Sequence, residues 1–412
     1  MRKIAVALIA ILALGAGAAH AGSDGQDFTR IEHGRYLATV GDCAGCHDEP
    51  GGAHPLAGGM KIETPFGTIT ASNITPDKDT GIGAWSDDEF VRALTHGIRR
   101  DGAHLYPAMP YPYYTKVNRD DLLAIRAYLS TVPPARHEAG GDDLPFPLDK
   151  RSAMAAWNKM YFTPGEFRPT AGKSAEWNRG GYLVEGLAHC GACHTPKNLA
   201  GADKSGETLQ GNPVQGWFAP EVTDASPKGL GAWSAEDIVA YLKTGHNKFT
   251  AATGPMGDVV NRSTSKMTDA DLHAIATYLK DQPGSGDKQP TAIAASDPAM
   301  KTGAAVYADE CAACHTAHGT GSPRLFPSLA GSASVQSDDP TSLIRVVLAG
   351  TRSVGTKAAP TSPAMPSFGA TLDDREAAAV LTYIRNSWGN AAPAVDAAKI
   401  HDIRKSLTQH SG

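Results

Sequence analysis

The sequence predicts a mainly α-helical protein made of three tandem domains, and three observations support this. The pattern Cys-x-x-Cys-His occurs three times in the 412 residues and uses all six cysteines. Each occurrence lies between two segments whose apolar residues recur at helical spacing. Stretches rich in proline, glycine and polar residues separate the units. The predicted domains span 25–165, 170–285 and 296–392, and a tail follows over 393–412.

The first residues predict a signal peptide over 1–21. A basic start, Met1-Arg2-Lys3, precedes an apolar run over 4–18 and the small-residue sequence Ala19-His20-Ala21, which is the pattern of an export signal and its cleavage site. The apolar run is shorter than the ~20 residues that a membrane-spanning helix needs. We therefore expect an exported mature chain that begins near Gly22.

Bulk composition excludes several classes of protein. With 41% hydrophobic and 20% charged residues, the chain is neither disordered nor a multi-span membrane protein. Its formal net charge of −5, without a basic cluster, excludes a nucleic-acid partner.

The three cysteine motifs carry the chemistry. Two thiols three positions apart on a helical turn can form thioether bonds to the vinyl groups of a haem, and the next histidine then serves as proximal iron ligand. A zinc ribbon would pair two such motifs roughly 15–20 residues apart, whereas these lie 147 and 121 residues apart. The sequence therefore predicts three covalently bound haems c, each wrapped in a class I cytochrome c-like domain. The predicted attachment residues are Cys43, Cys46, Cys190, Cys193, Cys311 and Cys314, and the proximal ligands are His47, His194 and His315.

Methionine is the usual second axial ligand of such haems because its thioether favours ferrous iron. Met109, Met256 and Met365 each stand in a proline- or glycine-rich segment just before a helical pattern. They follow the motif histidines by 62, 62 and 50 residues. A lone methionine is more often a core residue, and Met267, which opens an apolar helical pattern, fits that interpretation. The alternative distal ligands are the spare histidines His96, His104, His246 and His318.

The helices on either side of the motifs are predicted to pack on one another. Short helices over 34–37, 181–184 and 303–307 precede the cysteines, and each begins with a glycine that would let another helix approach closely. Closing helices over 121–129, 271–279 and 375–384 carry apolar stripes at helical spacing.

The first two repeats are more similar to each other than to the third. Both contain Gly-Ala-Trp-Ser, followed by helices predicted over 89–94 and 236–242. Trp85 and Trp233 are candidates for lining a haem pocket and donating an indole N–H to a propionate, and core packing explains them equally well.

The third repeat instead carries a loop like that of small soluble cytochromes c, with Pro327 after Phe326. There the proline carbonyl typically accepts a hydrogen bond from the proximal histidine, here His315. In the tail, Val395, Ile400 and Ile403 predict a terminal helix, in preference to a helix lying on a partner or a membrane surface.

Besides the haem motifs, six sequence segments resemble a known protein family: 41–43, 73–85, 106–111, 174–190, 254–256 and 365–368. On these residues the chain resembles the triple-haem cytochrome c subunits of bacterial membrane-bound, quinone-linked dehydrogenases that oxidise alcohol, gluconate, sorbitol, fructose, glucose or aldehyde. The resemblance implies a catalytic partner containing flavin, PQQ or molybdenum, and ubiquinone or a terminal oxidase as acceptor. It also implies peripheral attachment at the outer, periplasmic face of the cytoplasmic membrane.

The residues themselves favour an electron relay that does not oxidise a substrate by itself. With both axial positions filled, no iron is open to substrate, and no Gly-x-Gly-x-x-Gly follows a predicted strand. Two alternatives stay open: a stand-alone diffusible multihaem carrier, and a haem enzyme with one open iron site.

Overall fold

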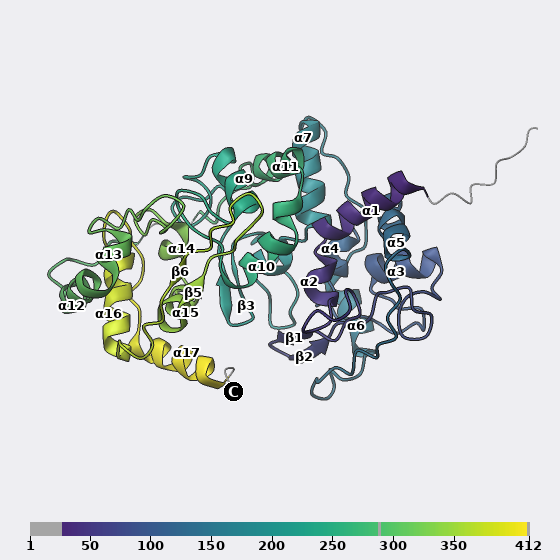
Figure 1. Cartoon of the computed structure of the whole chain (residues 1–412), viewed down its shortest axis with the longest axis horizontal. Coiled ribbons are helices and arrows are strands. Elements are labelled where there is room, and N and C mark those ends of the chain that lie inside the picture. Colours follow the sequence, from purple (N-terminus) through teal and green to yellow (C-terminus); the bar gives the residue numbers. More distant parts are fainter. Residues whose placement is uncertain (1–26, 287–289, 410–412) are drawn as a thin grey trace, which may run out of the picture.

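The computed structural model describes residues 27–286 and 290–409, so the predicted signal peptide over 1–21 lies outside the described residues. The described chain is mainly helical, and its strands form two-stranded antiparallel sheets (Figure 1). The strand pairs are β1 (Lys61–Thr64) with β2 (Gly67–Thr70), β3 (Asn212–Val214) with β4 (Trp217–Ala219), and β5 (Thr351–Arg352) with β6 (Ala364–Met365). Within these ranges, no helix has the length and apolar character needed to cross a membrane.

The helices follow the predicted order of opening helix, haem motif and closing helix in each repeat. In the first repeat they are α1 (Phe28–Val40), α2 (Cys43–His47), α3 (Asp87–His96), α4 (Tyr111–Tyr114), α5 (Arg119–Leu129) and α6 (Ala153–Tyr161). In the second they are α7 (Ala175–Tyr182), a π-helical turn (Leu183–Leu187), α8 (Gly191–His194), α9 (Ala235–Thr244), α10 (Gly254–Arg262), a 3-10 turn (Thr264–Lys266) and α11 (Asp269–Leu279). In the third they are α12 (Pro298–Val306), a π-helical turn (Tyr307–Cys311), α13 (Ala312–His315), α14 (Ala333–Gln336), α15 (Thr341–Ala349), α16 (Asp374–Arg385) and α17 (Ala397–Gln409).

Each opening helix packs on its closing helix, as predicted: α1 on α5, α7 on α11, and α12 on α16. The close approach through glycine is confirmed in the first and third pairs. A Cβ atom added at Gly34 would lie 1.8 Å from the carbonyl oxygen of Ala124, and one at Gly303 would lie 2.2 Å from that of Ala379. A larger residue at either position would therefore push the two helices apart.

In the second pair Gly181 also faces α11, as predicted, but the closest approach of the backbones is at the preceding Gly180. A Cβ at Gly180 would lie 2.0 Å from the carbonyl oxygen of Ala274, while Gly181 faces the rings of Phe167 and Tyr278. Tyr278 belongs to α11, so Gly180 and Gly181 both line the crossing of α7 and α11.

The shared Gly-Ala-Trp-Ser segment ends in the N-cap of a helix in both repeats. Ser86 and Ser234 each accept a hydrogen bond from the backbone three residues on, and the acidic side chains of Glu89 and Asp237 bond back to the cap. This reciprocal capping box satisfies N–H groups that a helix start otherwise leaves unpaired. The predicted helices over 89–94 and 236–242 are confirmed within α3 and α9.

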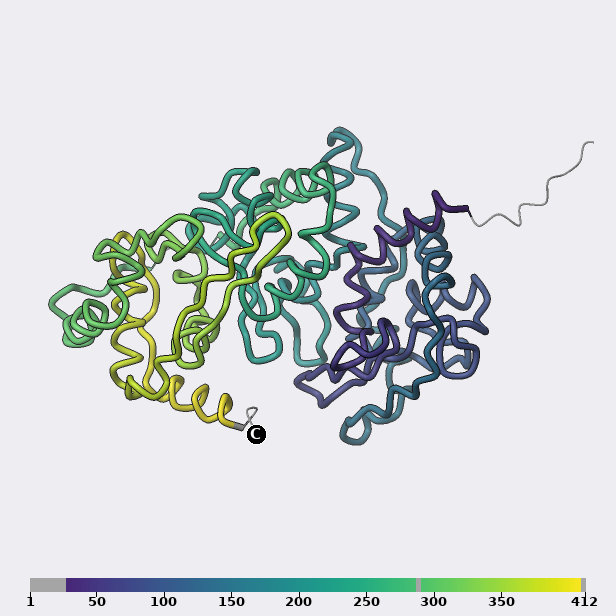
Figure 2. The backbone as a smooth tube through the Cα atoms, viewed as in Figure 1, coloured from purple at the N-terminus to yellow at the C-terminus, as the bar shows by residue number. Residues whose placement is uncertain are grey.

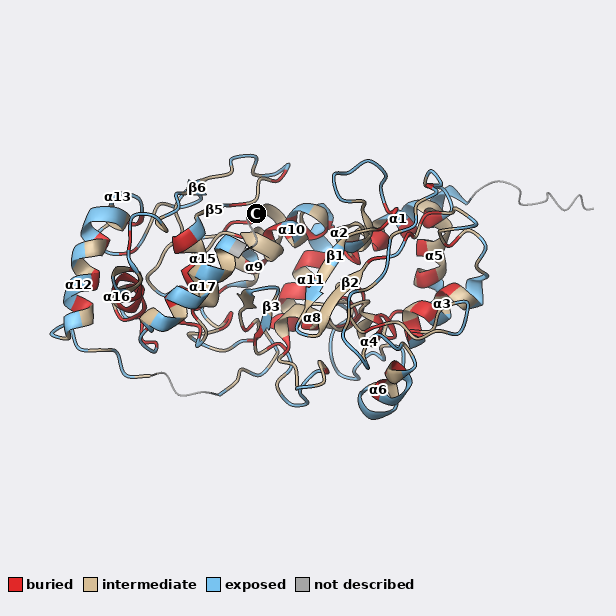
Figure 3. Ribbon diagram, turned by 90° about the horizontal axis from the view of Figure 1, so that it is seen from below, coloured by how far each residue is buried: buried red, intermediate tan, exposed pale blue. Residues whose placement is uncertain are grey.

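The apolar core is continuous across the first two repeats and separate in the third. Leu37, Leu122, Leu183 and Leu272 are fully buried in one core that takes residues from both repeats. The third repeat has its own core, which includes the fully buried Ile344. Figure 3 shows these buried faces along the helices of both regions. Repeats one and two are thus held together by the same apolar packing that folds each of them.

A reciprocal pair of hydrogen bonds also joins the first two repeats. Tyr36 on α1 donates to Asp271 on α11 at 2.6 Å, and Tyr182 on α7 donates to Asp121 on α5, also at 2.6 Å. Each carboxylate is further held by a basic side chain of its own repeat: His33 contacts Asp121 at 2.9 Å, and Arg179 contacts Asp271 at 2.8 and 2.9 Å. Burial raises the pKa of Asp271, but the hydrogen bonds from Arg179 and Tyr36 outweigh it and leave that pKa below its ordinary value.

The third repeat contacts the second through β4 and through the loop that follows β5. The Ser342 hydroxyl on α15 accepts from the backbone N–H of Phe218 at 2.9 Å and donates to its carbonyl at 3.0 Å. The backbone N–H of Val354 donates to the carbonyl of Ala252 at 3.1 Å. Figure 2 shows this yellow-green loop reaching across to the teal part of the chain.

The tail forms a terminal helix, α17, that packs on α15 and α16. Ile400 is fully buried there. Arg404 donates to the carboxylate of Asp374 at 2.8 Å and to the carbonyl of Leu372 at 2.9 Å. The apolar face of the tail is therefore used within the chain.

Candidate haem sites

The three cysteine motifs lie on short helices, α2, α8 and α13, each of which ends at the motif histidine. The six cysteines are not joined in disulfides. Burial raises the pKa of the thiols of Cys43 and Cys190 to about 12, and that of Cys311 to about 11. These thiols are therefore neutral in this structure.

The motif histidines share one arrangement. In each, Nδ1 contacts a backbone carbonyl, and because a carbonyl only accepts, Nδ1 carries the proton and Nε2 keeps its lone pair for a metal. Burial lowers the pKa of all three imidazoles, which keeps them neutral. The bonds join His47 to Ser72 at 2.7 Å, His194 to Pro220 at 2.7 Å, and His315 to Pro327 at 3.0 Å.

The bond from His315 to the Pro327 carbonyl was predicted from the sequence and is confirmed. The acceptors Ser72 and Pro220 were missed. Neither acceptor has a distinctive signal, because Pro196 and Pro213 also follow the second motif and because every residue carries a carbonyl.

The three predicted methionine ligands are partly buried, and each lies in a different local structure. Met109 lies in a turn before α4 and packs on the core shared by the first two repeats, which Cys43 and Cys190 also contact. Met365 lies on β6 and packs on the third core, as does Cys311.

Met256 lies inside α10, as its third residue, whereas the sequence placed it in a segment before a helix. The difference arises from Pro255, because proline is well tolerated in the first turn of a helix and does not end it there. The helix that carries Met256 packs against α2, the attachment helix of the first repeat.

The rival residues are also placed by the structure. Met267 is 1% exposed and belongs to the shared core, in agreement with its interpretation as a core residue. Among the spare histidines, His246 is buried, with Nδ1 3.1 Å from the carbonyl of Thr244 and with Nε2 unpartnered. Trp233 is buried and stacks on Phe249, with ring centroids 5.5 Å apart, so core packing accounts for this tryptophan.

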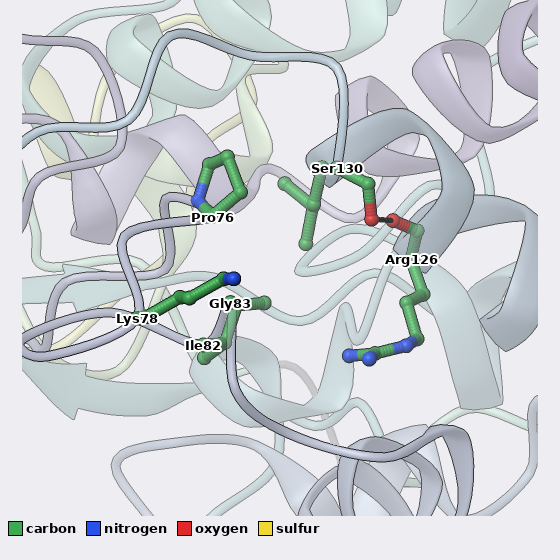
Figure 4. Close-up of a pocket in the computed structure, with 7 residues that line it drawn as sticks. Pro76, Lys78, Ile82, Gly83, Arg126 and Ser130 are labelled. Atoms are coloured by element: carbon green, nitrogen blue, oxygen red, sulfur yellow. Dashed lines mark hydrogen bonds between the residues drawn. The ribbon is translucent and has the colours of Figure 1, made fainter.

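A surface pocket of about 250 Å³ lies between the loop over 76–83 and α5 (Figure 4). Lys78 and Arg126 give it positive charge, and Arg126 also donates to Asp87 at 2.6 Å. None of the predicted attachment or axial residues lines this pocket.

A further feature tests whether the third repeat fits an anionic cofactor. Arg385 is fully buried and donates to the carbonyls of Pro393 at 3.1 Å and Val335 at 2.9 Å, but its Nη2 has no partner. Burial lowers its pKa to about 10. A buried guanidinium without a carboxylate is costly unless an anion joins it. Haem carries two carboxylates of that charge, and the unpaired Nη2 of Arg385, the free thiols and the unprotonated Nε2 atoms of the motif histidines are donors of the kinds that this group takes.

Comparison with known proteins gives one consistent result. The cytochrome c family model matches residues 180–283 and 300–388. The gluconate 2-dehydrogenase cytochrome c subunit of Pantoea cypripedii is 42% identical over 92% of this chain and 90% of its own length. The cytochrome c subunit of the quinone alcohol dehydrogenase of Gluconobacter oxydans is 41% identical over 98% of this chain and 87% of its own length. The fructose dehydrogenase cytochrome subunit of Gluconobacter japonicus is 36% identical over 91% of this chain and 82% of its own length.

Proposed function

This chain belongs to the cytochrome c subunits of quinone-linked dehydrogenases, and on that premise we propose that it carries electrons through three c-type haems. The electrons come from a catalytic dehydrogenase subunit that contains flavin, PQQ or molybdenum. They leave to ubiquinone or to a terminal oxidase. The relatives are named for gluconate, alcohol and fructose dehydrogenases, and these names support a dehydrogenase as the electron donor.

Three domains, 25–165, 170–285 and 296–392, would each hold one haem through the two thiols of its motif. When bound, each haem supplies one-electron oxidation and reduction at its iron. The observation that carries this proposal is the shared bond from Nδ1 of each motif histidine to a carbonyl. That bond holds the imidazole in one orientation, fixes its tautomer and strengthens Nε2 as a ligand. Met109, Met256 and Met365 would take the opposite axial positions.

Two alternative functions make different predictions. A haem enzyme needs one iron with a vacant or weakly held sixth position, so reduced protein would bind carbon monoxide rapidly at that site. We expect no such binding, because a methionine is available for each site. A stand-alone carrier would be isolated free of any dehydrogenase, whereas a subunit would co-purify with one large catalytic chain.

The proposal includes the location of the protein. We place it in the periplasm, at the outer face of the cytoplasmic membrane, on the basis of the export signal expected over 1–21. Fractionation after osmotic shock, with and without high salt, would separate a peripheral membrane protein from a freely diffusing one.

The decisive experiment compares the isolated chain with the complex. Alone, the protein should oxidise no alcohol, sugar or aldehyde. With its catalytic partner and substrate, the haem absorbance should show reduction of three equivalents on the timescale of turnover, and a ubiquinone analogue or oxidase should restore the oxidised spectrum. Substrate oxidation by the isolated chain, or quinone reduction that persists when the chain is removed, would refute the proposal.

A further inference from the structure

Arg262, the last residue of α10, reaches from the second repeat to the haem motif of the first. Its Nη1 donates to the carbonyl of Ala44 at 3.0 Å and to the carboxylate of Asp48 at 3.0 Å. Ala44 stands between Cys43 and Cys46, and Asp48 directly follows the motif histidine. Only about a third of the arginine side chain is exposed. One cation from elsewhere in the chain therefore spans the first attachment motif.

The second motif makes an equivalent contact, but its cation is Lys197 of the same repeat. Gly191 occupies the position that Ala44 holds in the first motif, and its carbonyl accepts from Nζ of Lys197 at 3.0 Å. Lys197 is paired with Asp203 and also contacts the hydroxyl of Tyr113 at 3.2 Å. Tyr113 belongs to the first repeat and donates to Asp203 at 2.6 Å. In both motifs the same carbonyl meets a cation paired with a carboxylate, and in both the other repeat takes part.

The third motif lacks this cation. The equivalent carbonyl, that of Ala312, accepts from the backbone N–H of Thr316 at 2.9 Å, and in the described part of the chain no lysine or arginine donates to it. The first two carbonyls accept the corresponding backbone N–H as well, from Asp48 at 3.2 Å and Thr195 at 3.0 Å. The cation is therefore an addition to a common backbone pattern.

A cation at this place has a defined electrostatic effect. Reduction removes one positive charge from an iron site, so a nearby fixed positive charge stabilises the reduced form and raises the reduction potential. The effect is larger at a partly desolvated position than in bulk water. At the first motif, Arg262 also offsets the carboxylate of Asp48, which lies next to the proximal His47 and acts in the opposite direction.

We propose that Arg262 raises the reduction potential of the first haem site from the second repeat, and that Lys197 does the same for the second site. This inference rests on the proposed function, since it takes the motifs as haem attachment sites. It makes the contact between repeats one and two part of the electron-transfer chemistry. The third site, without such a cation, has its potential set by other means.

The test is a spectroscopic redox titration of the holoprotein with Arg262→Gln, Arg262→Lys and a control, Arg119→Gln. Arg119 is an exposed arginine that pairs with Asp88, so its variant removes the same charge away from the motifs. We expect Arg262→Gln to lower one of three one-electron components, Arg262→Lys to restore most of that shift, and the control to leave all three in place. Lys197→Gln should lower a different component.

A variant that removes a negative charge at the same contact distinguishes an electrostatic effect on the potential from a loss of packing. Asp48→Asn keeps an acceptor for the N–H of Leu56 and removes the negative charge, so it should raise the component that Arg262→Gln lowers. A purely structural contact would move both variants in the same direction, and that result would overturn the inference, as would an unchanged titration of Arg262→Gln. Mass spectrometry of the wild-type chain decides the premise separately, because fewer than three attached haems would refute the proposed function itself.

Discussion

Replacing Gly34 with alanine should destabilise the protein through the crossing of α1 and α5. The new Cβ would lie 1.8 Å from the carbonyl oxygen of Ala124 and 2.4 Å from its carbonyl carbon. The two helices would have to separate by about 1.5 Å, and overpacking of this kind costs about 1–3 kcal/mol or more. Separation would also loosen the packing of the fully buried Leu37 and Leu122. Alanine is the better helix former by about 1 kcal/mol, which leaves a net loss of roughly 1 kcal/mol from the middle of that range.

Urea unfolding of the oxidised holoprotein, followed by circular dichroism, measures this loss. The matched control is Gly141→Ala, because an added Cβ there meets nothing within 4 Å and the backbone is not left-handed. The transition of Gly34→Ala should fall to lower urea than that of the control. If Gly34→Ala unfolds at the same urea concentration as Gly141→Ala or higher, the close helix crossing does not carry the stability assigned to it.

Three further predictions concern ligation, pH and maturation. Met256→Ala should remove about a third of the methionine-to-iron charge-transfer band. Met267→Ala should keep the band and lower the free energy of unfolding by about 2–5 kcal/mol as a core truncation. Loss of the band in Met267→Ala but not in Met256→Ala would show that the ligand of the second site is misassigned. The folded-state pKa of Asp271 is depressed. Its contribution to stability is therefore fully present above its unfolded pKa near 3.8 and is lost as the pH falls through the folded value. Asp271→Asn should weaken the pH dependence of urea unfolding in acid, and an unaltered dependence would contradict this. Expression in the cytoplasm without residues 1–21 should give a chain that does not melt cooperatively, since covalent haem completes each core; a folded haem-free protein would count against that.

Local features of this fold could be predicted from the sequence because neighbouring residues determine them. The helices that flank each motif follow from apolar spacing, and the caps at Ser86 and Ser234 follow from a serine three residues before an acidic one. The acceptor at Pro327 could be predicted because a proline marks it, whereas Ser72 has no such mark. Met256 was placed outside a helix because its flanking glycines and proline suggested a loop.

Contacts between repeats could not be predicted, because they join residues that are far apart in the chain. Tyr36 and Asp271 are 235 positions apart, and Arg262 and Ala44 are 218 apart. Reading the repeats as separate units predicts each helix pair but not the shared core.

The reciprocal bonds of Tyr36 and Tyr182 have the form of a two-fold symmetric interface, in which residue i of one copy contacts residue j of the other and the reverse. A dimer of identical haem domains would make this contact, and its two sites would be bound to stay identical. Within a single chain the halves can change independently, so that a histidine holds Asp121 where an arginine holds Asp271. The single chain thus keeps the close geometry of a symmetric dimer while the surroundings of the two motifs differ, and under the proposed function this difference would make the two reduction potentials unequal.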